Sequence, residues 1–300
     1  MWIDIGQHAF QKWENNHDGY GSFQDLEGAS LEDVRNFHRD YYGPNNAVLS
    51  IAGDVTPAQG FALARKYFGD IAKRPTPKPG DFTEPLNTAE KRVEQSDTLA
   101  QVPAIAAAWK MPDRGSKDQA PMAVLGELLA GGDASLFYQG IVKGRELALN
   151  VDALYGLTSP WEYDGPTLYT VFFVYKPTTN ADAMLTAMDE EIAKVVKNGV
   201  DAATLRRVKT RMLADWNDSL ESFINRADKL AKLQTLWGDA NVVNKIPSWI
   251  EGVTSADLQR VAKNYLTREN RTTIDRKPVA AAKPAAPAPA AAPAPAGAKS

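Results

Sequence analysis

The sequence of 300 residues contains no cysteine. This absence excludes disulfides, zinc sites built on thiolates and a cysteine nucleophile. It does not identify the compartment, because cytosolic and periplasmic proteins alike can lack cysteine. Localisation therefore stays open, and a periplasmic or other extracytoplasmic parent protein remains compatible with the sequence.

An excess of charge of one sign and a long apolar run are also missing. The 34 Lys and Arg residues against 37 Asp and Glu give a net charge of −3, with the basic residues scattered along the chain. We therefore expect no nucleic acid partner.

No window reaches the roughly 18 continuous apolar residues of a membrane-spanning helix. Residues 1–13 also lack the basic start, apolar core and cleavage site of a signal peptide.

Histidine is scarce, with only His8, His17 and His38 in the chain. Zinc hydrolysis needs two or three His or carboxylate ligands around an open coordination position. The spacings of 9 and 21 residues place no two imidazoles at i and i+4 on one helix face. We interpret all three as ordinary helix or turn residues, and we expect neither a metal site nor a catalytic residue in this chain.

Other catalytic motifs are absent or incomplete. No G-x-S-x-G nucleophile elbow occurs. The stretch 131–135 (GGDAS) lacks the lysine of a phosphate-binding loop and follows a helical pattern, so nucleotide binding is rejected. The acidic run 189–191 lies in an amphipathic helical pattern and is interpreted as a solvated helix face.

The most informative feature present is an internal repeat. Residues 30–48 (SLEDVRNFHRDYYGPNNAV) recur in weakened form at 254–272 (TSADLQRVAKNYLTRENRT). The identical pairs are Asp33/Asp257, Tyr41/Tyr265 and Asn46/Asn270. Each copy predicts a helix whose first turn is capped by a hydroxyl, from Ser30 or Thr254, with apolar residues at helical spacing.

A strand is expected after each repeat helix. Residues 47–53 (AVLSIAG) are apolar and typical of a buried strand, whereas residues 271–275 (RTTID) are more polar and indicate an edge strand. The second copy closes a unit that begins near residue 93, while only 29 residues precede the first copy. A complete first copy would need about 130 more residues ahead of Met1.

The chain is therefore expected to contain four parts: a C-terminal remnant of a first domain (1–72), a proline-rich linker (73–90), a second domain (91–278) and a disordered Ala/Pro tail (279–300). Within the second domain, strands are expected at 91–94, 103–110, 147–155 and 168–175, and helices at 119–129, 180–198, 201–216 and 220–236. This pattern predicts the α+β class, with helices on one face of a mainly antiparallel sheet.

Three segments carry a resemblance to a known family. Residues 30–55 (SLEDVRNFHRDYYGPNNAVLSIAGDV) resemble the segment that closes the first domain of pitrilysin/insulinase-type zinc peptidases. Residues 128–137 (LLAGGDASLF) resemble the glycine-rich helix break of that family, and residues 144–151 (GRELALNV) resemble its K-R-G-L-A-Y-S-V stretch. The resemblance spans about residues 20–275 and implies tandem mitochondrial-processing-peptidase-like domains that enclose a peptide substrate, with zinc on the first.

The family's zinc motif, H-x-x-E-H followed by a distal glutamate, is not found here. Glu14 is the one candidate for that glutamate, and its position beside the turn HDGYG argues against the role. The resemblance thus implies zinc in the full-length parent rather than in this chain. It also implies a C-terminal part of a metalloendopeptidase that is inactive alone.

Many family members carry an Arg and a Tyr seven residues apart that contact the substrate or the developing oxyanion. Val142 and Leu149 stand at these positions, and aliphatic side chains cannot donate hydrogen bonds. The resemblance therefore implies a heterodimer with a second peptidase-family subunit that supplies the pair. The alternative is a non-catalytic scaffold or chamber subunit of the same superfamily.

Overall fold

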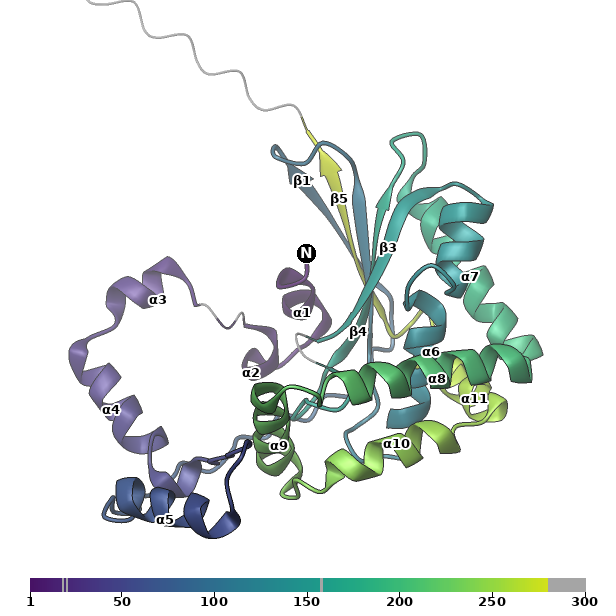
Figure 1. Ribbon diagram of the computed structural model, residues 1–300. Helices are drawn as coiled ribbons and strands as arrows, with labels where there is room; N and C mark the ends of the chain where they lie inside the picture. Colours follow the sequence, from purple (N-terminus) through teal and green to yellow (C-terminus); the bar gives the residue numbers. More distant parts are fainter. Residues whose placement is uncertain (18, 20, 157–158, 280–300) are drawn as a thin grey trace, which may run out of the picture.

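The centre of the molecule is a five-stranded sheet. The computed structural model describes residues 1–17, 19, 21–156 and 159–279. The strand order is β1-β5-β2-β4-β3 (Figure 1). The strands are β1 (Lys91–Asp97), β2 (Ala104–Lys110), β3 (Ala148–Tyr155), β4 (Leu168–Tyr175) and β5 (Arg271–Pro278). β1 runs parallel to β5, and the other neighbouring pairs are antiparallel.

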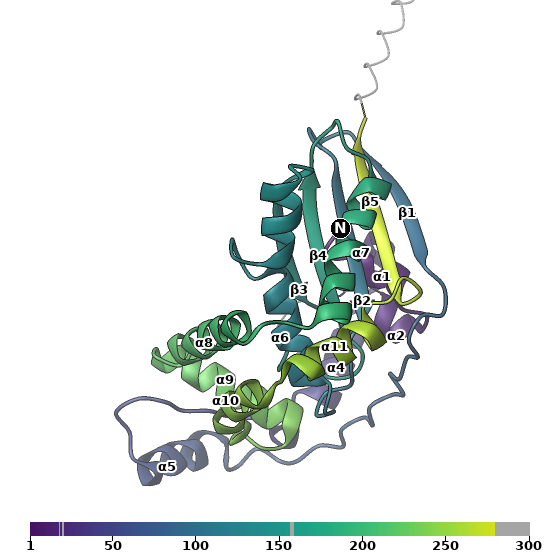
Figure 2. The same ribbon diagram turned by 90° about the vertical axis from the view of Figure 1, so that its right-hand side faces the viewer.

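Helices pack against one face of the sheet and below its lower end in the view of Figure 2. These helices are α6 (Gln119–Ala130), α7 (Ala181–Asn198), α8 (Ala202–Asp218), α9 (Phe223–Trp237), α10 (Val242–Gly252) and α11 (Ser255–Tyr265). α11 packs against α6 and α7, and α8 packs against α6 and α10. The arrangement confirms the predicted α+β class.

Alternation along β2 and β4 separates the two sides of the sheet, because successive side chains of a strand point to opposite faces. Trp109, Tyr169 and Phe173 belong to the large core between sheet and helices. Ala106 and Leu168 belong to a second, smaller cluster on the opposite side. β2 is buried at every position, which explains why its sequence, AIAAAWK, has no polar residue before its end.

The glycine-rich helix break expected within residues 128–137 ends α6. Gly131 follows the last helical residue, and Gly132 has a φ of +70°, a conformation that a residue with a Cβ rarely adopts. The chain then enters a π-helical turn, η2 (Tyr138–Gly144), that leads into β3. The strands and helices predicted for residues 91–237 are confirmed, with ends that differ by up to three residues.

The expectation that residues 271–275 form an edge strand is wrong, since β5 lies between β1 and β2. Two of its polar side chains, Arg271 and Asp275, are buried and paired on the helix side rather than solvated. Arg271, 1% exposed, contacts Glu90 and Asp189 of α7, and Asp275 accepts a hydrogen bond of 2.6 Å from the Tyr175 hydroxyl. Buried polar residues with such partners are compatible with a central strand.

The acidic run 189–191 is only partly the solvated face that its pattern indicates. Asp189 pairs with buried Arg271, and Glu191 is itself buried and pairs with Lys194.

The helix α10 was not expected from the sequence. Its pattern is interrupted by Pro247, a residue that usually breaks a helix.

The expectation of a buried strand at residues 47–53 is wrong as well. This segment has no strand structure, and Val48, Leu49 and Ile51 are exposed. It lies among α3 (Phe23–Gly28), α4 (Leu31–Tyr41), the short turn η1 (Pro44–Asn46) and α5 (Pro57–Phe68). These elements form an arc away from the sheet (Figure 1). No neighbouring strand is available to satisfy its backbone groups, so β propensity alone does not produce a strand.

The first sixteen residues, by contrast, return to the sheet. They form two short helices, α1 (Asp4–Ala9) and α2 (Trp13–Asn16), and α1 contacts β2 and β5. Figure 1 shows α1 on the side of the sheet opposite the covering helices. The predicted tail, residues 279–300, lies beyond the described residues except for Val279.

Candidate functional site

The sheet face opposite the helices, called the open face here, is the candidate functional surface. Its apolar strip consists of Ala106 and Ala108 of β2, Leu168 of β4 and Ile274 of β5. The register places Ala106 between Phe172 of β4 and Ile274 of β5. The strip is buried, with Ala106, Ala108 and Ile274 at 0% exposure and Leu168 at 4%.

A buried ion pair lies at one end of this strip. The Lys110 ammonium is 2.8 Å from Glu84, and the two side chains are only 2% and 1% exposed. The same Glu84 carboxylate accepts hydrogen bonds from the backbone amides of Gln11 (2.9 Å) and Lys12 (2.7 Å). This single carboxylate therefore ties together the central strand, the linker and the N-terminal segment.

Burial raises the pKa of Glu84, because it disfavours the charged form. The hydrogen bonds from Lys110, from the two backbone amides and from Asn15 outweigh burial and bring the pKa to about 2. Glu84 is thus an ionised structural anchor at neutral pH, with its oxygens engaged by donors. It is not suited to accept a proton from a reacting group.

Val142 and Leu149, the two positions singled out in the sequence, lie on neighbouring elements. Val142 belongs to η2 and packs against the large core. Leu149 lies in β3, an edge strand, at a bulge between Ala148 and Asn150, and 53% of its surface is exposed. Neither side chain carries a hydrogen-bond donor, so neither can stabilise an oxyanion.

The three histidines are dispersed. His17 stacks on Trp13 and His38 stacks on Tyr42, while His8 lies in α1. Glu14 lies exposed on α2. Within residues 1–17, 19, 21–156 and 159–279, no three His, Asp or Glu side chains converge in a way that could hold a metal ion.

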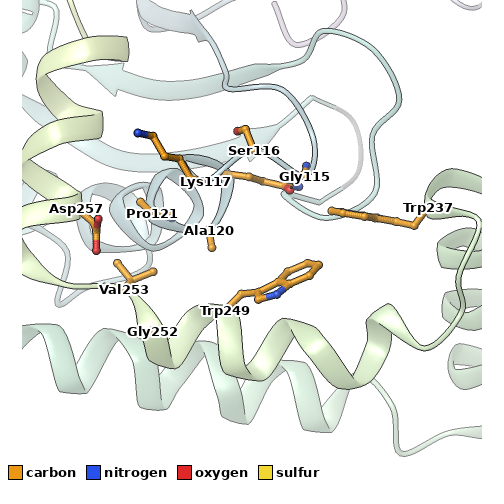
Figure 3. A pocket seen from close by; sticks show the side chains of 11 residues that line it. Gly115, Ser116, Lys117, Ala120, Pro121, Trp237, Trp249, Gly252, Val253 and Asp257 are labelled. Carbon is orange, nitrogen blue, oxygen red and sulfur yellow. Dashed lines mark hydrogen bonds between the residues drawn. The ribbon is translucent and has the colours of Figure 1, made fainter.

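A separate cavity of about 370 Å³ lies on the helix side. Figure 3 shows Trp249 across from Ala120 and Pro121 of α6, with Trp237 beside it. The two indole centroids are 5.3 Å apart, and the Arg114 guanidinium lies 5.4 Å from the Trp237 ring centroid. The walls can hold an apolar group. The Asp257 carboxylate at its edge is already engaged by Thr254 and Arg260.

Sequence reasoning missed both the Lys110–Glu84 pair and this cavity. Lys110 could have been noticed as the one charge ending an otherwise apolar strand. Glu84 gave no comparable signal, since it lies in the proline-rich linker. The cavity depends on α10, which the sequence analysis did not anticipate.

No helix among the described residues is both long and apolar enough to cross a membrane. This finding concerns only the part of the chain that the structure describes.

Comparisons of this chain with known proteins agree on one family. The model of the peptidase M16 inactive domain matches residues 28–212. The zinc protease PqqE of Helicobacter pylori is 25% identical over 273 residues, which cover 86% of this chain and 57% of that protein. The chain thus spans little more than half the length of this curated relative.

Solved structures agree on the fold. The crystal structure of a protease from Helicobacter pylori has a TM-score of 0.83 at 23% identity, over 92% of this chain and 66% of that one. The peptidase M16 inactive domain from Pseudomonas fluorescens has a TM-score of 0.79 at 15% identity, over 94% and 65% of the two chains. The resemblance to pitrilysin-type peptidases is thereby confirmed, and since the family model matches more than half of its residues, this chain belongs to the peptidase M16 inactive domain family.

Proposed function

We propose that this chain is the non-zinc half of a pitrilysin-type zinc endopeptidase, where it helps to enclose a peptide substrate. The observation that carries the proposal is the match to the inactive-domain family over residues 28–212. The relative from Helicobacter pylori is named a zinc protease, which suggests the activity of the assembly in which such a domain works. On this proposal the chain hydrolyses no peptide by itself.

Zinc is then held by an H-x-x-E-H-bearing unit outside these 300 residues. The H-x-x-E-H residues of that unit would hold the metal, which would supply an activated water for hydrolysis, whereas His8, His17 and His38 are dispersed. This chain contributes the open face and the β3 edge as one side of the enclosure around the peptide. In the same proposal residues 1–72 belong to a first domain, 73–90 to a linker and 91–278 to the second domain.

The oxyanion donors come from a second subunit of the family in this proposal. Val142 and Leu149 replace the Arg and Tyr that other members use, and both are aliphatic. Removing one such donor typically lowers kcat about 10²- to 10³-fold, so a working enzyme needs another source. A heterodimeric assembly with a subunit that carries the pair meets this requirement.

The test is reconstitution. The purified chain is assayed with a quenched fluorescent peptide and added zinc, first alone and then after co-expression with two M16 units, one that bears H-x-x-E-H and a partner that bears the Arg/Tyr pair. We expect no hydrolysis alone, and chelator-sensitive hydrolysis by a co-purifying complex. Leu149→Ala in this chain should leave kcat unchanged, whereas replacing the partner's Arg should lower it.

Two outcomes would redirect the proposal. Chelator-sensitive hydrolysis by the chain alone, with stoichiometric zinc, would overturn it. Stable assembly without any hydrolysis would favour the scaffold or chamber subunit instead.

A further inference from the structure

The apolar strip of the open face already holds a peptide, namely the chain's own α1. Ile5 and Ala9 are spaced by four residues, so they lie on one face of the helix. They are 3% and 1% exposed and pack against the strip formed by Ala106, Ala108, Leu168 and Ile274. Trp2 extends the contact, with its ring centroid 5.2 Å from that of Phe172.

Cations from two strands hold the ends of this helix. Lys91 of β1 donates to the carbonyls of His8 (3.0 Å) and Ala9 (3.1 Å), which are the last two residues of α1. Arg276 of β5 lies 3.1 Å from the Asp4 carboxylate in the first turn. A cation at the carbonyl end and an acidic residue at the amide end both suit the helix dipole.

The surface, rather than the sequence of α1, accounts for its helical form. α1 has six residues, and its N-cap, Ile3, makes no side-chain hydrogen bond to the first turn. Isolated helices shorter than about 12–15 residues are marginal in water. The strip and its two cations therefore impose helical structure on a segment that would not hold it alone.

The chain after α1 is held through its backbone as well. The amides of Gln11 and Lys12 donate to Glu84, and the Lys110 ammonium lies 5.6 Å from the Phe10 ring centroid. Backbone hydrogen bonds of this kind accept many sequences, whereas the strip selects apolar residues at the correct spacing.

We propose that the strip, together with Lys91 and Arg276, is a binding site for an amphipathic segment of a peptide substrate, which α1 occupies in cis. The segment carries two apolar residues four apart, with an acidic residue just ahead of the first. That the segment belongs to a substrate rests on the proposed function. A tethered occupant acts at an effective concentration on the order of millimolar, so α1 keeps weaker peptides out.

The test uses the full chain and a fluorescein-labelled peptide with the sequence of residues 2–14, followed by fluorescence anisotropy. Ile5→Asp combined with Ala9→Asp should release α1 and strengthen binding of the added peptide at least about tenfold over the unmodified chain. The matched control peptide, with Asp in place of the residue equivalent to Ile5, should not bind. Lys91→Gln in the opened chain should weaken binding of the native peptide.

A milder variant covers the case in which the double substitution disturbs folding. Asp4→Lys places a cation beside Arg276 and should also strengthen peptide binding, while circular dichroism remains unchanged. Equal binding of the two peptides, or equal binding by opened and unmodified chains, would overturn the proposal. Because no zinc-bearing unit and no hydrolysis are involved, failure here is distinct from failure of the proposed function.

Discussion

α4 and α11 arise from the same repeated sequence pattern, and their surroundings differ. Both helices begin with a capping box, Ser30 with Asp33 in α4 and Thr254 with Asp257 in α11. In α11, Leu258 and Val261 are fully buried against α6 and α7. In α4 the corresponding residues, Val34 and Phe37, are 59% and 56% exposed.

The segments that follow the two helices differ in the same way. Residues 271–278 form a central strand although they are polar, and residues 47–53 form no strand although they are apolar. The comparison shows that a capped helix can form from local signals. A strand needs neighbouring strands, and an apolar helix face needs a packing partner.

The largest difference between the two regions should be their resistance to proteolysis. We expect thermolysin to cut first between residues 23 and 80 and to leave a fragment that contains β1 to β5. Segments with few buried apolar contacts open at a free-energy cost near zero, whereas a packed core opens only on global unfolding. Mass spectrometry of a digestion time course checks this, with the urea-unfolded chain as the control for cleavable sites. Equal lifetimes of both regions would contradict it.

Breaking the buried ion pair should give the largest change in stability. Glu84→Gln leaves Lys110 buried without its counter-charge, and we expect a loss of about 3–5 kcal/mol in the free energy of unfolding. The matched control is Asp40→Asn, which breaks the exposed pair with Arg39 in α4 and should have no measurable effect. Urea unfolding followed by tryptophan fluorescence measures both. Similar midpoints for the two variants would refute the structural role of Glu84.

The same pair predicts a pH dependence. The pKa of Glu84 is about 2 in the folded protein, below the 4.5 of a free glutamate. Its contribution to stability is therefore complete above about pH 4.5 and is lost as the pH falls toward 2, because the unfolded chain binds the proton more readily. Urea midpoints measured from pH 6 to pH 3 should fall less steeply for Glu84→Gln than for the unmodified chain.

The next largest difference in stability between variants of the two repeat helices should come from core packing. Leu258→Ala removes a fully buried side chain, and we expect a loss of about 2–5 kcal/mol. Val34→Ala at the equivalent position of α4 should stay within about 0.5 kcal/mol. Chemical denaturation of both variants provides the measurement. If Val34→Ala were as costly as Leu258→Ala, α4 would have to be packed in solution.

The smallest expected difference concerns the caps. Thr254→Ala removes the hydroxyl that caps α11 and should cost about 1 kcal/mol. Ser30→Ala removes the corresponding cap of α4 and should leave the cooperative transition of the core unchanged, because α4 makes little contact with it. Differential scanning calorimetry measures the Tm of both variants. Equal shifts in Tm would show that both helices belong to one cooperative unit.

Much of residues 91–278 could be predicted from the sequence. β4 matches its predicted range of 168–175, and α7 begins one residue after its Asn180 cap. The Lys110–Glu84 pair could not be predicted, because its partners are 26 positions apart and Glu84 lies in a linker without periodicity. The roles assigned to Val142 and Leu149 came from family resemblance, since an aliphatic pair carries no chemical signal of its own.

The sequence by itself determined the capped helices and the apolar strands β2 and β4, because these depend on residue type and local spacing. Only the tertiary structure decided that polar β5 lies within the sheet, that Glu84 is ionised and buried, and that α1 covers the apolar strip of the open face. Each of these depends on partners distant in sequence, whose burial and charge change the free energy of a residue without leaving a local pattern.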